Sequence, residues 1–267
     1  MFVVNYRFHQ EARTQHSKIS PIHYHDDYEL YYLLKGTTKY IVDKEIFSLK
    51  EGDFIFIPKS SYHYTNSELC TNTERILISF DDTIFDSSTQ PILEELYAHP
   101  LMHIPLDKKH IIDDIINKLR IEHKRPDSVH KQVFIKIYTL ELLTMLCRQQ
   151  KASNFTSSYD DILIEKISNY IKENFSKDIS LTSLSTIFAM NHCNISHKFK
   201  AITGIPFSQY LTLVRLSNAE KLLLETNLSI NEISLKCGFN DSNYFSNVFK
   251  KHRGISPLTY KKNKLTN

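Results

Sequence analysis

The sequence contains little cysteine, and the cysteines are not arranged to bind zinc or to form a disulfide framework. The four of them are far apart and form no C-x-x-C pair: Cys70, Cys147, Cys193 and Cys237. This spacing excludes a zinc knuckle and a small disulfide-stabilised domain. It favours a reducing compartment, so we expect the protein to work in the cytoplasm.

Long apolar runs are also missing. The longest stretches, such as residues 29–34, are far shorter than the roughly 20 residues that a helix needs to cross a bilayer. Residues 1–10 lack a basic segment followed by an apolar run, so we expect neither a secretory signal nor a membrane partner. With 41% hydrophobic and 24% charged residues, the chain has the composition of a globular protein rather than a disordered one.

Charge is distributed unevenly along the chain. Residues 1–160 contain 19 Lys and Arg against 22 Asp and Glu, whereas residues 161–267 contain 14 against 8. The net charges are therefore −3 and +6. A basic C-terminal part indicates a module that binds a polyanion such as DNA, although many surfaces of this charge bind no nucleic acid.

The first 85 or so residues have the pattern of short strands separated by turns. Turn residues occur at Gly36, at 43–44 and at 51–53. The spacing of the strands predicts an all-β sandwich or barrel. The expected strands, rich in Tyr, Ile, Val and Phe, are 29–34, 38–42, 45–49, 54–58 and 75–80.

Helices are expected after Asp86, at 91–99, 108–123 and 129–149. The apolar periodicity predicts buried faces made of Ile111, Ile112, Ile115, Ile116 and Leu119 in the second helix, and of Val133, Ile137, Leu140 and Met145 in the third. The polar, Ser-rich residues 149–158 are the best candidate for a linker. We therefore expect an α+β protein with domains at 1–150 and 161–267 and a linker at 151–160.

The C-terminal part is expected to be all helical, and it contains an internal repeat. Residues 199–204 align with residues 249–254, which lie 50 positions later. Residues 180–185 align with residues 229–234, which lie 49 positions later. Two copies are too few to form a stable solenoid. A duplicated DNA-binding unit accounts for the repeat better.

Each copy has the parts of a helix-turn-helix. In the second copy Ser229 and Glu232 form a capping box, Gly238 ends the first helix and Asp241 caps the next. The buried stripe of that helix is expected to be Phe245, Val248 and Phe249. In the first copy Ser180 and Asn191 are the caps, and the residues expected to pack are Leu181, Leu184, Ile187, Ile195, Phe199 and Ile202.

The opposite faces of the second helices carry polar residues that suit the major groove. Asn pairs with adenine edges, Ser and Lys reach bases or phosphates, and a helix N-terminus favours a phosphate. A solvated helix face has a similar composition, but its occurrence in two copies favours DNA binding. The candidate DNA-binding residues are His192, Cys193, Ser196, His197 and Lys200 in the first copy, and Ser242, Asn243, Ser246, Asn247, Lys250 and Lys251 in the second.

Residues 229–257, SINEISLKCGFNDSNYFSNVFKKHRGISP, resemble the signature of the AraC/XylS family of transcription regulators along nearly its whole length. Residues 215–219, RLSNA, resemble the helix that links the two units of that family. The resemblance covers residues 161 to about 262 and implies two recognition helices that read adjacent major-groove segments on one face of DNA. The family often has basic residues at His197 and Asn247 and an apolar one at Lys198. These departures bear on DNA sequence preference and not on the fold.

Two motifs in the N-terminal part resemble those of cupin barrels. The first contains His23, His25 and Glu29, and the second contains His63. His23 and His25 are two apart and so point to one face of a strand; Glu29 shares this parity unless a turn at 26–27 breaks it. The position where the second motif usually has Gly is Ser60, and its Asn is displaced to Asn66.

Three interpretations of these residues remain open. In cupin enzymes such a set binds Fe, Mn or Zn, and imidazole and carboxylate suit these metals. In regulatory barrels of the resembled family, the histidines instead contact a small-molecule effector or serve packing. We expect effector binding by His23, His25, Glu29, Tyr31 and His63, with a metal as the alternative and no cofactor.

A cupin enzyme is the competing function, but paired helix-turn-helix units have no use in an enzyme, so we expect no catalysis. Several tyrosines near the barrel suit a carbohydrate-like effector, although most are expected to serve packing: Tyr24, Tyr28, Tyr31, Tyr32, Tyr40, Tyr62 and Tyr64. Residues 108–123 and 129–149 resemble the helices through which the family dimerises, or they only cover the barrel. The expected partners are double-stranded DNA, an effector, a second copy of the chain and, for an activator, RNA polymerase.

Overall fold

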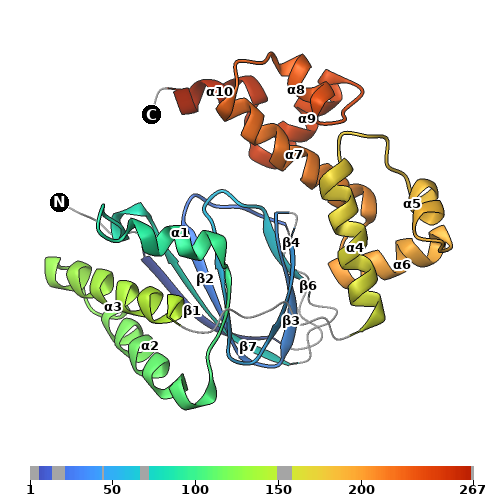
Figure 1. Cartoon of the computed structure of the whole chain (residues 1–267). Coiled ribbons are helices and arrows are strands. Elements are labelled where there is room, and N and C mark those ends of the chain that lie inside the picture. The colour runs from blue at the N-terminus through green and yellow to red at the C-terminus, as the bar shows by residue number, and fades with distance from the viewer. Residues whose placement is uncertain (1–5, 14–21, 44, 67–71, 149–157, 266–267) are drawn as a thin grey trace. The chain divides into compact units, whose positions relative to one another are not determined.

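The computed structural model describes residues 6–13, 22–43, 45–66, 72–148 and 158–265. The chain divides into two compact units (Figure 1). The first contains residues 1–42 and 46–156, and the second contains residues 157–267 together with 43–45. The expected linker lies largely outside the described residues. Its last two positions begin helix α4 (Tyr159–Asn174), which is capped by Ser158.

Two antiparallel sheets face each other in the first unit and form the expected barrel (Figure 1). One sheet has the strand order β1-β7-β2-β5-β8 and the other has the order β4-β3-β6. The strands are β1 (Tyr6–Arg13), β2 (Tyr28–Lys35), β3 (Thr37–Val42), β4 (Glu45–Lys50), β5 (Asp53–Ile57), β6 (His63–Asn66), β7 (Thr73–Phe80) and β8 (Leu101–His103). Strands β1, β6 and β8 were not predicted.

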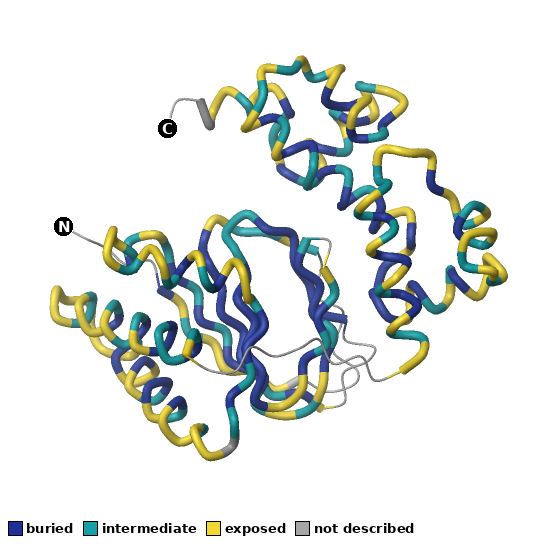
Figure 2. Tube along the Cα trace, in the orientation of Figure 1, coloured by how far each residue is buried: buried dark blue, intermediate teal, exposed yellow. Residues whose placement is uncertain are grey.

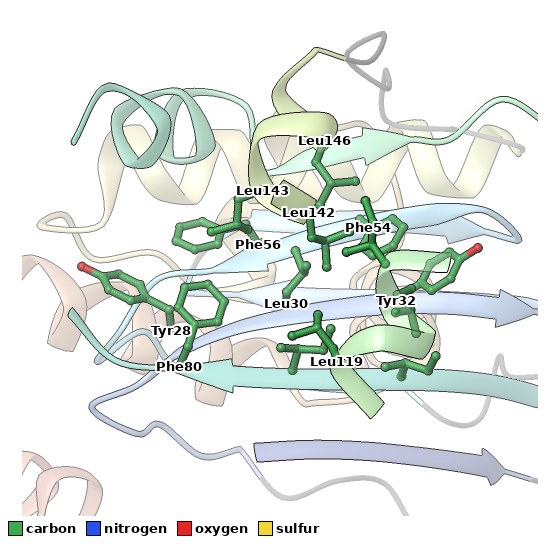
Figure 3. Packing of buried hydrophobic residues seen from close by; sticks show 14 of the residues in the cluster. Tyr28, Leu30, Tyr32, Phe54, Phe56, Phe80, Leu119, Leu142, Leu143 and Leu146 are labelled. Atoms are coloured by element: carbon green, nitrogen blue, oxygen red, sulfur yellow. The ribbon is translucent and has the colours of Figure 1, made fainter. Parts of the chain in front are cut away.

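Both sides of β2 are buried, which explains why the strand reads as an almost continuous apolar run. Tyr28, Leu30 and Tyr32 belong to the core between the five-stranded sheet and the helices, together with Leu119 and Leu142 (Figure 3). The residues between them point to the other side, because successive strand residues alternate. There Tyr31 and Leu33 join a second core that also contains residues of β3, β4 and β5. This second core lies between the two sheets.

Three helices cover the outer side of the five-stranded sheet (Figure 1): α1 (Gln90–Ala98), α2 (Lys109–His123) and α3 (Val129–Cys147). Short 3-10 helices precede two of them, η2 (Asp82–Ile84) and η3 (Leu106–Lys108). In α2 the predicted face is confirmed except for Ile111, which is exposed; the buried residues include Ile112, Ile115, Ile116 and Leu119.

The predicted buried face of α3 is wrong at Val133 and Ile137, whereas Leu140 and Met145 are half-buried and pack against the core as expected. The buried residues are Ile135, Thr139, Leu142, Leu143 and Leu146. Val133 and Ile137 are instead 50% and 49% exposed. Apolar side chains surround this helix almost completely, so their periodicity does not identify the side that packs on the sheet. The outward sides of α2 and α3 are exposed in Figure 2.

The second unit consists of short capped helices: α4, α5 (Leu181–Ile187), α6 (His192–Thr203), α7 (Phe207–Glu225), α8 (Ile230–Lys236), α9 (Ser242–Arg253) and α10 (Pro257–Leu265). The predicted caps Ser180, Asn191, Ser229 and Asp241 all accept a hydrogen bond from a backbone N–H. Helix α7 runs between α4–α6 and α8–α10 (Figure 1).

Packing of the first helix-turn-helix differs from the prediction at one residue. Leu184 is fully buried, but Ile187 is 48% exposed. Helix α5 has only seven residues and ends at Ile187, so this residue lies beyond the part of the helix that contacts the core. In the described part of the chain, no helix is long and apolar enough to span a membrane.

Candidate DNA-binding and effector sites

Helix α9 has one buried and one exposed face. Phe245 and Phe249 are fully buried and pack against each other in the core of the second helix-turn-helix. The other side presents the candidate DNA-binding residues: Asn243, Asn247, Lys250 and Lys251 are exposed, and Ser242 and Ser246 are half-buried. Val248, expected in the buried stripe, is also half-buried.

Helix α6 has the same layout. Ile195 and Phe199 are buried. His192, Cys193, His197 and Lys200 are exposed and Ser196 is half-buried. Lys198 lies to one side, where its Nζ contacts both carboxylate oxygens of Asp160 at 2.5 Å. The geometry therefore leaves the candidate residues available to DNA and assigns Lys198 to the attachment of α6 to α4.

A buried ion pair fixes the end of α9, and it was not predicted. The guanidinium of Arg253 donates from Nε and Nη2 to the two carboxylate oxygens of Glu220 at 2.5 Å each. The side chains are 3% and 11% exposed. Glu220 belongs to α7, so this pair ties α9 to α7. In the sequence Arg253 is one of several basic residues at the end of a helix, and no neighbouring residue indicates that it is the buried one.

Three histidines meet in the barrel, as the motifs predict. His23, just before β2, forms an isolated bridge with His63 at the start of β6; the amide of each donates to the carbonyl oxygen of the other. His25 lies beside them. One ring nitrogen of each of the three histidines lies within 4.8 Å of the other two.

Hydrogen bonds to carbonyl groups fix the tautomers of two of these rings. Nδ1 of His25 donates to the carbonyl oxygen of Asp27, and Nδ1 of His63 donates to that of Ser61, each at 2.8 Å. A carbonyl oxygen only accepts, so both Nδ1 atoms carry a proton. In the neutral rings the lone pair is then on Nε2. The Nε2 atom of His63 is buried, and no atom in the described part of the chain forms a hydrogen bond with it.

Glu29 joins this cluster from β2. Its Oε2 lies 3.3 Å from Nε2 of His25, and its Oε1 accepts a hydrogen bond from the hydroxyl of Tyr40 at 3.0 Å. A bend at residues 26–27 lies between Glu29 and the two histidines His23 and His25, yet Glu29 still faces the histidine cluster as expected. Tyr40 was named among the tyrosines that suit a carbohydrate-like effector, but it was not among the predicted site residues that the structure shows it to contact.

Burial and charge shift the pKa values of these groups in different directions. The hydrogen bond to Glu29 raises the pKa of His25. Burial lowers the pKa of His63 to about 4. Burial raises the pKa of Glu29, but the hydrogen bond with His25, the charges of both histidines and the Tyr40 hydroxyl outweigh burial, so the carboxylate titrates below its ordinary value. The site thus holds a carboxylate beside one imidazole that protonates readily and one that does not.

Tyr31 is buried further along β2. Its ring packs against that of Tyr40, with 4.9 Å between centroids, and the guanidinium of Arg75 lies 5.5 Å from it. Tyr31 thus reaches the site through Tyr40. Tyr28 and Tyr32 belong to the core on the helix side of the sheet. The packing interpretation therefore holds for these two.

An unusual turn brings the two motifs together. Ser60, at the position where glycine is usual, has a φ of 64°, which is a left-handed conformation. Its amide donates to the carbonyl of His25 at 2.7 Å, and its hydroxyl donates to Asp26 at 2.9 Å. These bonds hold the turn before β6 against the segment that carries His23 and His25.

The site fits a divalent metal. Metal-binding histidines usually donate the other ring N–H to a carbonyl or carboxylate, as His25 and His63 do here. Three imidazoles with an adjacent carboxylate suit Fe, Mn or Zn. Glu29 lies beside the histidine cluster rather than within the group of atoms closest to one another.

Comparisons with known proteins agree with both domains. The helix-turn-helix domain family matches residues 184–263 and the cupin domain family matches residues 12–68. The HTH-type transcriptional activator RhaR of Mannheimia succiniciproducens is 26% identical over 90% of this chain and 87% of its own length. RhaS of an Enterobacter species, also named a transcriptional activator, is 23% identical over 89% and 86%.

Among solved structures, the C-terminal domain of AraT, a response regulator from Geobacillus stearothermophilus, is 34% identical. The match covers 40% of this chain and 88% of that domain, with a TM-score of 0.38. The full-length relatives are transcriptional activators and not enzymes. The chain therefore belongs to the AraC/XylS family of DNA-binding transcription regulators, with a cupin barrel followed by a double helix-turn-helix domain.

Proposed function

We propose that this protein is a transcriptional activator whose action on DNA is controlled by a small molecule bound in the barrel. The names of the relatives support activation. One observation supports the ligand most directly: Nε2 of His63 is buried without a hydrogen-bond partner among the described residues. A buried polar atom that lacks a hydrogen bond costs about 1–3 kcal/mol, and a bound ligand would remove this cost.

DNA would be read by the exposed faces of α6 and α9. On α9, Asn243 and Asn247 have the side chains that pair with adenine edges, and Lys250 and Lys251 suit phosphates. Ser242 and Ser246 complete this face. On α6 the contacts would come from His192, Cys193, Ser196, His197 and Lys200.

The effector would contact His23, His25, Glu29 and His63, and Tyr31 would support it through Tyr40. A carboxylate, imidazole nitrogens and tyrosine rings in one place suit a compound with several hydroxyl groups, such as a carbohydrate. A polar effector of this kind donates to Glu29 and to Nε2 of His63, since both accept hydrogen bonds.

A metal-dependent sensor is the second candidate, and the tautomers of His25 and His63 favour it. His23, His25 and His63 would hold the ion beside Glu29. The bound ion would supply a positive charge for oxygen atoms of the effector. In this arrangement the carbonyls of Asp27 and Ser61 keep the imidazoles oriented.

We also propose that the chain is a homodimer that contacts RNA polymerase when it activates. The outward sides of α2 and α3 support dimerisation, because they expose an unusual number of large apolar residues for a water-facing surface: Ile111, Ile121, Val129, Val133, Phe134 and Ile137.

The double variant His25→Ala/His63→Ala tests the sensor. It should keep basal DNA binding and lose the thermal shift that a responsive metabolite gives the wild type in a screen of carbohydrates and divalent metals. The matched control is His99→Ala/His110→Ala, since both of these histidines are exposed in the same unit. A double variant that still responds normally contradicts the effector site. Stoichiometric metal in untagged wild type, and none in the variant, selects the metal-dependent form.

A further inference from the structure

The two helix-turn-helix units meet at a tight junction around Arg215 of α7. The Arg215 guanidinium donates from Nε to the carbonyl of Phe175 and from Nη2 to the carbonyl of Lys177, both at 2.9 Å. These carbonyls lie directly after α4, the first helix of the domain. Arg215 lies in the helix that leads into the second unit, and it holds the segment that follows the first helix of the first unit.

Gly238, in the turn between α8 and α9, closes this junction from the other side. A Cβ at this position would lie 2.8 Å from the carbonyl oxygen of Phe175, 2.9 Å from that of Ser176 and 3.0 Å from Nε of Arg215. Real Cβ atoms do not approach a backbone oxygen so closely. The turn of the second unit is therefore in direct contact with the segment that follows α4.

The internal repeat shows that the turn itself does not require glycine. Ala189 occupies the equivalent place in the first unit, one residue after the cap of α5, and it has a φ of 49°. Gly238 has a φ of 80°. Ala189 is exposed and carries a Cβ in this conformation. The requirement for glycine at 238 therefore includes the contact with Phe175 and Ser176 in addition to the backbone conformation.

Side-chain packing joins the same segments. The side chain of Phe175 packs against the core of the second unit. The guanidinium carbon of Arg215 lies 5.9 Å from the ring centroid of Phe239, the residue next to Gly238. One arginine thus contacts the end of the first unit through hydrogen bonds and the turn of the second unit through its flat face.

We propose that Arg215 and Gly238 are positioning residues that set the distance and angle between α6 and α9, and with them the number of base pairs between the two DNA segments that the protein prefers. This inference depends on the proposed use of α6 and α9 as recognition helices. Asp160 and Lys198 link α6 to α4, and the turn at Gly238 leads into α9. A shift at the junction is therefore a shift of one recognition helix relative to the other.

DNA makes such a shift measurable. One base pair advances the helix by roughly 3.4 Å and turns it by about 34°, so an extra base pair between the segments misplaces one recognition helix. The probe is a duplex that the full-length wild type selects from a random library. Derivatives would carry one or two base pairs inserted or deleted between the two protected segments, and binding would be measured at fixed salt.

Two variants and a matched control test the junction. Arg215→Lys keeps the charge but loses the fork that reaches two carbonyls. Gly238→Ala adds the colliding Cβ. Gly254→Ala is the control, because Gly254 also has a positive φ, 73°, but a Cβ there would have no atom of the described residues within 4 Å. Circular dichroism would establish that each variant is folded.

Wild type and Gly254→Ala should lose about tenfold or more in affinity for each change of one base pair. In Arg215→Lys and Gly238→Ala the optimum should move by one base pair, or this loss should fall below about threefold. Folded variants that keep the wild-type optimum and the wild-type loss overturn the inference. Unfolding of both junction variants while the control folds also overturns it, since the junction then only maintains the fold. A wild type with no preferred spacing contradicts the proposed DNA-reading helices instead.

Discussion

Replacing Arg253 should destabilise the DNA-binding domain far more than removing the Arg253–Glu220 pair as a whole. In Arg253→Met the carboxylate of Glu220, whose side chain is 11% exposed, loses the arginine charge that it faces. Breaking a buried ion pair in this way costs about 3–5 kcal/mol. In Arg253→Met/Glu220→Leu neither charge has to be desolvated. Exchange of a buried pair for apolar residues is close to neutral, or stabilises by about 1–4 kcal/mol.

Hydrogen exchange of the α9 amides is the suitable assay, because it reports the opening of this unit in the full-length protein. A loss of 3–5 kcal/mol should speed the slowest of these amides by about a hundred- to a few thousandfold, since each 1.4 kcal/mol is a factor of ten. Lys198→Met is the control in the same unit. Its pair with Asp160 is 34% and 41% exposed, and such pairs contribute about 1 kcal/mol or less.

Two results would refute this reasoning. One is an effect of Arg253→Met as small as that of Lys198→Met. The other is a double variant as unstable as Arg253→Met, which would mean that the shape of the arginine matters and its charge does not.

Three further predictions concern DNA contacts, pH and packing. Asn247→Ala should relax the preference for particular bases by about 1–3 kcal/mol at one or two positions of the DNA site. Lys250→Ala should weaken binding to all DNA sequences alike and lower the salt dependence of binding. If the two variants have identical binding profiles, the proposed orientation of α9 on DNA is wrong. His63 has its folded pKa lowered to about 4, so the unfolded chain takes up a proton more readily and stability falls as the pH drops from about 6.5 to 4. The wild-type barrel should lose up to about 3 kcal/mol more than His63→Gln over this range, measured by urea unfolding. Phe249→Ala should lower the free energy of opening of this unit by about 3–5 kcal/mol, as reported by hydrogen exchange of the α9 amides. Leu235→Ala should lower it little, because Leu235 is exposed.

The parts of the fold that depend on neighbouring residues could be predicted from the sequence. The capping box of Ser229 and Glu232 and the left-handed Gly238 are present as expected, because caps and turns are decided within a few residues. The clustering of His23, His25 and His63 was also predictable, because the spacing of the two motifs that contain them resembles that of cupin barrels.

Features that depend on distant contacts were not predictable. Strand β1 carries charged residues such as Arg7 and Glu11, and it is recognisable as a strand only by its pairing with β7. The side of α3 that packs on the sheet is chosen by the sheet and not by the helix. The contact between Gly238 and the carbonyl of Phe175 joins residues more than 60 positions apart and leaves no local pattern.

Strand β2 has consequences for how relatives of this protein can diverge. Residues 28–33 are all buried, but alternate residues contact different surroundings. The even-numbered residues, Tyr28, Leu30 and Tyr32, are constrained by the helices. The odd-numbered ones face the space between the sheets, where Glu29 meets the histidines. Substitution at every second position of one strand can therefore change the surroundings of the proposed effector site without requiring any change in α2 or α3.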